Sequence, residues 1–194
     1  MKFDGSSVAT LKRMKFFVAA ALTICCAWSQ EIQFTKDNRL VRPSNYREWT
    51  FLSSGLGMTY GPADGTQSRP LFDNVFVNPA AYKAFLETGK WPDKTIFILE
   101  VRESASKGSI NQDGHFQSEI AHVSAEVKDS SRFPDKWEYF TLPASGEPGQ
   151  ALPRSAGCFA CHTKNGAVEN TFVQFYPTLL PVARAKGTLK STAQ

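Results

Sequence analysis

The chain has 194 residues, of which 42% are hydrophobic and 12% aromatic, so it can fill one hydrophobic core and is short for two. Its formal net charge is +4, but without residues 1–29 the net charge falls to +1. Because the remainder carries no cluster of Lys and Arg, the composition argues against a protein that binds nucleic acid or an anionic membrane, and we expect one nearly neutral domain.

The N-terminal segment has the pattern of an export signal. Three basic residues precede the apolar run "FFVAAALTICCAW", which is too short to span a bilayer as a helix and has the length of a signal-peptide core. Small residues suit cleavage after Ser29, whether translation begins at Met1 or Met14. A buried N-terminal helix is the alternative, but "WSQEIQF" turns polar and continues no helical period. We therefore expect residues 1–29 to be a signal peptide and residues 30–194 to form one periplasmic or otherwise exported domain without a membrane anchor.

The first predicted elements are two strands and a helix. The stretch "REWTFLSSGLGM" (residues 47–58) carries β-favouring side chains before a Gly/Ser turn, and "FDNVFVNP" (residues 72–79) alternates until a proline stops it. The stretch "PAAYKAFLETGKW" (residues 79–91) opens with Pro79 at a first helical position and closes near Gly89. This pattern predicts a short helix.

Two further strands are predicted in the middle of the chain. The stretch "KTIFILEVRES" (residues 94–104) is a β-branched and aromatic run, and "HFQSEIAHVSAEVKDS" (residues 115–130) alternates well enough for a strand. The polar stretch between them, residues 104–114, predicts a hairpin. Together the elements predict a β-rich α+β fold, an antiparallel sheet with short helical insertions, followed by a C-terminal segment.

The C-terminal segment contains "CFACH", which brings Cys158, Cys161 and His162 together. Once the signal is removed, these two cysteines are the only ones in the chain, so no disulfide framework is expected. A zinc site would need a second pair of ligands, and the other histidines, His115 and His122, lie far upstream and are not paired with cysteines. The zinc interpretation is therefore weak.

Two other interpretations of the motif remain. A thiol redox pair in an oxidising compartment usually lies at a helix start after a strand, whereas a Gly/Pro-rich stretch precedes this motif. Covalent haem attachment accounts for the spacing, since two thioethers must reach one porphyrin edge while the adjacent imidazole lies over the iron. An export signal together with C-x-x-C-H favours haem: Cys158 and Cys161 then tether one haem c per chain, and His162 is its proximal iron ligand.

Several long stretches resemble the cytochrome P-460 family, in the same order over residues 44–182. They are "NYREWTFLSSGLGM", "FDNVFVNPAAYKAFLETGKWPDKTIFILEVRES", "VKDSSRFPDKWEYF" and "CFACHTKNGAVENTFVQFYPTL". The resemblance implies a β-rich periplasmic haem c protein, usually a homodimer, with His162 as proximal ligand and an open or weakly occupied distal side. It also makes the C-terminal segment the haem c binding segment.

One position departs from the family pattern. Members that oxidise hydroxylamine have a lysine next to the residue matched here by Glu100, and that lysine cross-links to the porphyrin. This chain has Leu99 there, which has no nucleophilic nitrogen. Ser124 stands approximately where those members carry a proton-relaying glutamate. The resemblance therefore points to the non-cross-linked branch, cytochrome c′-beta, whose apolar distal pockets bind small gases such as nitric oxide.

The distal side of the expected haem site has one further candidate. Phe97 shares one face of the "TIFIL" strand with Leu99, so Phe97 should wall the same apolar pocket. The alternative function is a haem oxidoreductase or electron carrier that acts on hydroxylamine or a related small nitrogen compound and passes electrons to a small redox protein. Leu99 favours gas binding, while the family resemblance as a whole keeps the oxidoreductase open.

Four other residues could contact the haem. Met58, His115 and His122 could each supply a sixth iron ligand, but Met58 lies in a Gly-rich turn and both histidines flank polar stretches, so surface or hairpin positions are favoured. Arg132 in "SSRFP" could pair a haem propionate or form an exposed structural ion pair. If none of the first three binds the iron, the ferrous iron should be five-coordinate.

Overall fold

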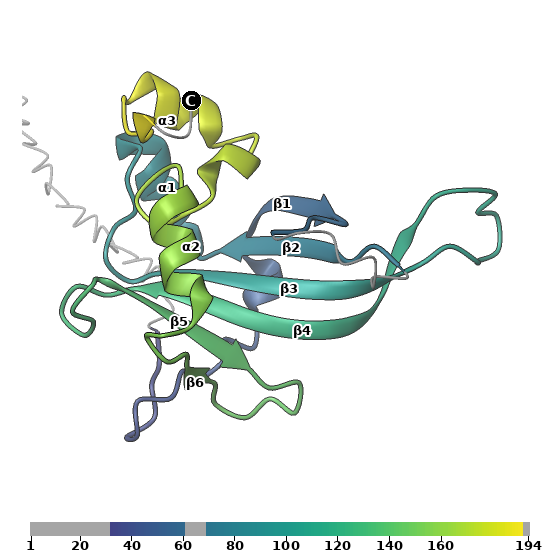
Figure 1. Ribbon diagram of the computed structural model, residues 1–194, viewed down its shortest axis with the longest axis horizontal. Coiled ribbons are helices and arrows are strands. Elements are labelled where there is room, and N and C mark those ends of the chain that lie inside the picture. Colours follow the sequence, from purple (N-terminus) through teal and green to yellow (C-terminus); the bar gives the residue numbers. More distant parts are fainter. Residues whose placement is uncertain (1–31, 61–68, 192–194) are drawn as a thin grey trace, which may run out of the picture.

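A computed structural model describes residues 32–60 and 69–191, which form a six-stranded antiparallel sheet with helices packed against it (Figure 1). The strands are β1 (Thr50–Leu56), β2 (Phe72–Val77), β3 (Thr95–Ala105), β4 (Phe116–Lys128), β5 (Trp137–Leu142) and β6 (Gln150–Ala151). They lie in the order of the sequence, so each pairs with its neighbours along the chain. The expected β-rich α+β class is confirmed, while the expected signal peptide lies outside the described residues.

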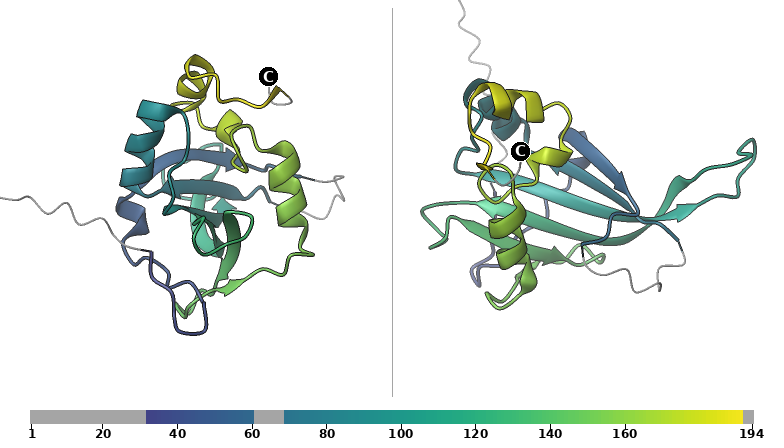
Figure 2. Two further views of the ribbon diagram at one scale, coloured as in Figure 1. Left: turned by 90° about the vertical axis from the view of Figure 1, so that its left-hand side faces the viewer. Right: turned by 45° about the horizontal axis from the view of Figure 1, so that its top comes forward.

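Strands β3 and β4 are the longest in the sheet and lie at its centre. Their bounds agree within two residues with the strands predicted from the sequence. The predicted polar hairpin between them extends away from the rest of the molecule (Figure 1; Figure 2, right). Ile110 near its tip is 91% exposed. The sequence analysis missed β5 and β6.

The helices are α1 (Pro79–Thr88), α2 (Gly157–Asn165) and α3 (Leu180–Ala185), with short 3-10 turns η1 (Tyr46–Glu48) and η2 (Val173–Phe175). Helix α1 confirms the predicted short helix. It ends because Gly89 adopts a left-handed conformation, with φ 70°, and donates its N–H to the Phe85 carbonyl. In the described ranges, no helix combines the length and the apolar composition needed to cross a bilayer.

The two faces of the sheet carry different side chains because residues alternate along each strand. On the pocket face, two rows of paired residues run across the central strands: Val77, Phe97, Glu126 and Tyr139, and next to them Val75, Leu99, Ser124 and Thr141. On the back face, the intervening residues form a separate buried cluster, which includes Ile96, Ile98, Val123, Val127 and Leu142.

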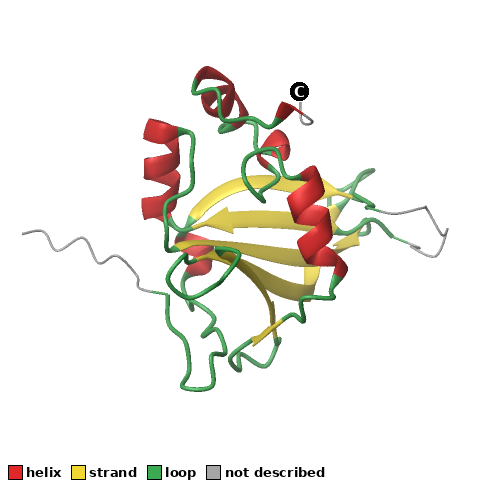
Figure 3. Ribbon diagram, turned by 60° about the vertical axis from the view of Figure 1, so that its left-hand side comes forward, coloured by secondary structure: helices red, strands yellow, loops and turns green. Residues whose placement is uncertain are grey.

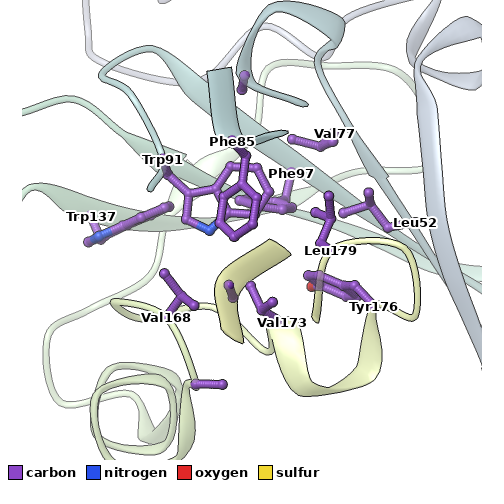
Figure 4. Close-up of a cluster of buried hydrophobic side chains, with 13 residues drawn as sticks. Leu52, Val77, Phe85, Trp91, Phe97, Trp137, Val168, Val173, Tyr176 and Leu179 are labelled. Atoms are coloured by element: carbon purple, nitrogen blue, oxygen red, sulfur yellow. The ribbon is translucent and has the colours of Figure 1, made fainter. Parts of the chain in front are cut away.

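Helices cover part of the pocket face. Phe85 of α1 packs against Trp91, with ring centroids 4.1 Å apart, and Trp91 meets the edge of Phe97 at 4.7 Å (Figure 4). Tyr176 stacks near Phe97 from the C-terminal segment, at 6.3 Å. This aromatic cluster fills one end of the pocket face, and α2 lies across the strands beyond it (Figure 3).

Candidate functional site

A cavity of about 480 Å³ lies between the pocket face of the sheet, helix α2 and the segment around η2. Its volume is within the range of roughly 300–1,000 Å³ that is typical of sites for cofactors and drug-sized ligands. The sheet contributes Val75, Phe97 and Leu99 to its wall, and the C-terminal segment contributes Phe172 and Phe175. A site of this kind suits a large, mostly apolar molecule.

Helix α2 presents the three residues of the C-x-x-C-H motif to this cavity. Cys158, Cys161 and His162 all line it, and they lie within about one turn of the helix, which begins at Gly157. Both thiols are free and partly exposed. The two sulfurs and the imidazole therefore reach the cavity from a single rigid element.

The imidazole of His162 is held between two aromatic rings. The Tyr139 ring lies 4.6 Å from it and the Phe172 ring 4.5 Å, between centroids. Its Nδ1 donates to the Asn170 carbonyl at 2.8 Å, so the neutral ring keeps its lone pair on Nε2. This hydrogen bond fixes the tautomer that a histidine needs to bind a metal through Nε2.

A buried glutamate lies beside this histidine. The Glu126 Oε1 atom is 3.5 Å from His162 Nδ1, and the Glu126 side chain is 11% exposed. Among the described residues, neither Glu126 Oε1 nor the Tyr139 hydroxyl has a hydrogen-bond partner. Burial raises the pKa of Glu126, and His162 opposes this effect only in part. Burial and the neighbouring Glu126 also raise the pKa of Tyr139.

The pKa of His162 is raised for the complementary reason. Burial alone would lower this pKa, but the Glu126 carboxylate and the Asn170 carbonyl outweigh burial because both favour the protonated ring. The C-x-x-C-H histidine thus has two acceptors on its Nδ1 side, one carbonyl in hydrogen-bond contact and one carboxylate slightly farther away.

The structure brings most of the residues predicted from the sequence into this one cavity. Phe97 and Leu99 line it together with the three motif residues, and Ser124 pairs directly with Leu99 across β3 and β4. Phe97 is 4% exposed and belongs to the aromatic cluster, whereas Leu99 lies at a more open part of the wall.

Arg132 is not brought to the cavity. Its Nη1 donates to the Asn38 side chain at 2.8 Å, its guanidinium lies 4.2 Å from the centre of the Phe34 ring, and its Nε is 3.9 Å from Asp129. Arg132 therefore contacts a chain segment on the back face of the sheet. Of the two roles considered, pairing with a haem propionate and a structural ion pair, the structure shows contacts of the structural kind.

Met58 and His122 both line the cavity, although we expected surface or hairpin positions for them. For His122, which is exposed, the two descriptions are compatible. Met58 packs so closely over Gly55 that a Cβ at that glycine would overlap the methionine sulfur. His122 is exposed but follows the same alternation as Ser124, so it lies at the cavity mouth. His115 lies in the exposed hairpin, as expected.

The outer end of the cavity is more polar than the expected apolar pocket. Tyr60, Asp73 and His122 line this end, and the Tyr60 hydroxyl is 3.5 Å from Asp73 Oδ2. Burial raises the pKa of Asp73, whereas Tyr60 is 68% exposed. The cavity lining around Leu99 is therefore largely apolar, whereas the mouth carries polar side chains.

Sequence reasoning missed Glu126, Tyr139 and the carbonyl of Asn170. Glu126 follows His122 and Ser124 at the period of a strand, so the sequence placed these three side chains on one face. The missing information was the strand register. Only the pairing of Phe97 with Glu126, and of Glu126 with Tyr139, places Glu126 and Tyr139 next to His162. A backbone carbonyl leaves no trace in sequence composition.

The residues around the cavity fit a haem. One wall offers two free thiols and the imidazole of His162, whose Nε2 lone pair is available because Nδ1 carries the proton. The other walls are largely aromatic and aliphatic. Among the described residues, no three side chains of His, Cys, Asp or Glu are grouped as ligands for a bare metal ion.

Comparison with known proteins agrees with this geometry. The family model for cytochrome P460 matches residues 43–173, which include the sheet and the C-x-x-C-H motif. A comparison with curated proteins gives no match. Since the matched region covers well over half of the sequence, the chain belongs to the cytochrome P460 family, whose membership implies a haem cofactor.

Proposed function

We propose that this protein is an exported c-type haem protein that binds small gaseous ligands, such as nitric oxide, on the side of the haem opposite His162. Cys158 and Cys161 would hold the haem through thioether bonds, and His162 would bind its iron through Nε2. Bound in this way, the haem would supply an iron that can take up a small ligand. Export, expected from the sequence, and a homodimeric state, implied by the family resemblance, belong to the same proposal.

The observation that carries this proposal is the position of Leu99. This side chain lines the same cavity as the three motif residues, where hydroxylamine-oxidising relatives carry the lysine that cross-links the porphyrin. Leucine offers no nitrogen for that bond. Ser124 pairs with Leu99 and has only a hydroxyl, approximately where the hydroxylamine-oxidising relatives carry a proton-relaying glutamate.

Apolar side chains surround Leu99 in this part of the cavity. Val75 pairs with Leu99 from β2, and Phe97 lies two residues away on the same face. The side chains of Val75, Phe97 and Leu99 provide no hydrogen bond to a polar ligand, which disfavours bound dioxygen relative to nitric oxide and carbon monoxide. Ligand choice at Leu99 would then depend on size and polarity.

A second candidate function is supported by the polar mouth of the cavity. Asp73, Tyr60 and His122 could exchange protons with a small nitrogen compound, and general acid and base groups are what oxidation of such a compound requires. An oxidoreductase or electron carrier acting on hydroxylamine or a relative therefore remains the alternative, with a small redox protein as electron acceptor.

Ligand titration of the reduced protein separates the two functions. We expect a five-coordinate ferrous spectrum, a stable one-to-one complex with nitric oxide, and no steady turnover of hydroxylamine with an artificial electron acceptor. A six-coordinate low-spin ferrous spectrum without added ligand would contradict gas binding. Met58→Ala and His122→Ala would then identify which side chain binds the iron as its sixth ligand. Steady hydroxylamine turnover would establish the oxidoreductase instead.

A further inference from the structure

The Nδ1 proton of His162 has two possible acceptors of different chemistry. The neutral Asn170 carbonyl is at 2.8 Å, and the Glu126 Oε1 atom is at 3.5 Å without a hydrogen-bond partner in the described part of the chain. One N–H cannot form a good hydrogen bond to both acceptors at once. The Asn170 carbonyl therefore accepts the bond only while it lies closer to Nδ1 than the Glu126 carboxylate does. What fixes the position of Asn170 therefore decides which acceptor is used.

Asn170 lies in a tight loop, residues 166–171, that is closed by its own hydrogen bonds. The Ala167 N–H donates to the Thr171 carbonyl at 2.8 Å, and the Thr171 N–H donates to the Val168 carbonyl at 3.0 Å. Gly166 begins the loop at a point with no room for a side chain, since a Cβ there would lie 2.7 Å from the Asn170 carbonyl carbon. The loop packs too closely to turn its carbonyls freely.

Two anchors tie this loop to the sheet and to the aromatic cluster. The buried Trp91 Nε1 donates to Thr171 Oγ1 at 2.8 Å, and Lys128 Nζ pairs with Glu169 Oε2 at 2.7 Å. The Lys128 side chain is only 12% exposed, and it also donates to the Trp91 carbonyl at 2.6 Å. Trp91, Thr171, Lys128 and Glu169 thus form one connected set, here called the loop clamp.

The clamp and the competing carboxylate share strand β4. Lys128 lies two residues beyond Glu126, so both side chains leave the strand on the same face. Glu169 has φ 52°, a left-handed conformation that is unfavourable for a residue other than glycine. The strained residue next to Asn170 is therefore the one that the lysine holds.

We propose that the loop clamp selects the Asn170 carbonyl over Glu126 as the partner of the iron-binding histidine, and thereby raises the reduction potential of the bound haem. This inference rests on the proposed ligation of haem by His162. A carboxylate acceptor would draw the Nδ1 proton more strongly, make the imidazole a more electron-rich ligand and stabilise ferric iron. The carbonyl leaves a neutral imidazole and favours the ferrous state, which binds nitric oxide and carbon monoxide. Lys128 and Glu169 are positioning residues in this scheme.

The test compares Glu169→Ala with Glu169→Gln in the haem-loaded protein. Both variants remove the same charge, but only the glutamine side chain can keep a hydrogen bond to Lys128. We expect Glu169→Ala to raise the iron–histidine stretching frequency in the resonance Raman spectrum of the ferrous protein and to lower its reduction potential. Glu169→Gln should lie close to the wild type in stretching frequency. A thermal melt of each variant checks that the fold is intact.

Adding Glu126→Gln identifies the acceptor. In the Glu169→Ala background, this change should return the stretching frequency toward that of the wild type, and in the wild type it should leave the frequency almost unchanged. Equal frequencies in Glu169→Ala and wild type would overturn the inference, as would a large drop in frequency on Glu126→Gln alone. If the wild type gave no iron–histidine band, the five-coordinate ferrous state of the proposed function would be refuted, so the two failures are distinguishable.

Discussion

Glu100 and Glu126 lie on neighbouring central strands and are both buried, but they face opposite sides of the sheet. On the back face, Glu100 accepts from the Tyr46 hydroxyl, from Arg47 Nη2 at 2.5 Å and from Arg102 Nε at 2.5 Å. On the pocket face, Glu126 has His162 nearby and an oxygen without a hydrogen-bond partner in the described residues. One carboxylate is fully paired and the other is kept incompletely paired beside the predicted iron ligand.

The pKa values of the two carboxylates diverge accordingly. Burial would raise the pKa of either group, but the three donors around Glu100 outweigh burial and lower its pKa, whereas burial dominates at Glu126 and raises its pKa. A fully paired carboxylate stabilises a fold, and an incompletely paired one costs stability and is retained where function needs it. The back face is thus built for stability and the pocket face for chemistry.

Removing both thiols is the most severe way to disable the pocket face alone. Cys158→Ala combined with Cys161→Ala should abolish covalent haem attachment, so that acidified acetone extracts the haem and none stays with the denatured chain. A double change of Cys25 and Cys26 to Ala is the matched control and should keep the attachment, because these two cysteines are expected to leave with the signal. Haem that resisted extraction from the Cys158/Cys161 variant would refute the attachment.

Adjacent residues of β3 provide a sharper test, because they point to opposite faces. Phe97→Ala should destabilise the fold by about 4 kcal/mol and Ile98→Ala by about 3 kcal/mol, since both side chains are almost fully buried. Only Phe97→Ala opens the cavity, so only this variant should bind nitric oxide faster. Urea unfolding and stopped-flow ligand binding measure the two effects. Equal ligand-binding rates in both variants would show that Phe97 does not restrict access.

Replacing each carboxylate by its amide measures the contrast between the faces. At pH 7, Glu100→Gln should lower the free energy of unfolding by about 2 kcal/mol, because charge-assisted bonds are lost to three donors. Glu126→Gln should cost less than about 1 kcal/mol, because Glu126 has fewer partners. Urea unfolding of the haem-loaded variants gives both values.

The effect of Glu100→Gln should depend on pH in a defined direction. The pKa of Glu100 is lowered by folding, so its stabilisation is present above the ordinary value of 4.5 and is lost as pH falls through the lowered value. The difference in unfolding free energy between wild type and Glu100→Gln should therefore shrink toward pH 3. A constant difference from pH 7 to pH 3 would show that the ion pairs are not its source.

The smallest effect is expected from Leu99→Lys, which makes the pocket face more similar to that of hydroxylamine-oxidising relatives. Leu99 is only partly buried, so a lysine can direct its ammonium group toward the cavity mouth with little loss of stability. We expect at most weak hydroxylamine turnover, because Ser124 opposite lacks a carboxylate. Turnover comparable to that of a cross-linked relative would mean that Leu99 alone separates the two functions.

The parts of this fold that depend on local patterns could be predicted from the sequence. The β-branched run at β3 and the Pro79 to Gly89 signature of α1 gave elements with nearly correct bounds. Strand β5 was missed because its six residues, Trp137–Leu142, are mostly large and buried, and a short run of that kind shows no alternation.

The site was predictable only where the motif is contiguous. Spacing alone brought Cys158, Cys161 and His162 together, and strand alternation placed Phe97 beside Leu99. Arg132 was harder to place because Asn38, its partner, is 94 residues away in the sequence. The position of Glu126 likewise needed the register of three strands, which is decided by tertiary packing rather than by local propensity.

The sequential strand order also affects how the protein assembles. Strands that pair with their neighbours in the chain close short loops, which costs little entropy and favours rapid folding. The floor of the cavity, built from strands β1 to β5, can therefore form before helix α2 packs against it. Hydrogen exchange during refolding should protect β3 and β4 ahead of α2. Until that last step, Cys158 and Cys161 would stay accessible for the haem attachment proposed above, while the sheet that forms the cavity floor is already in place.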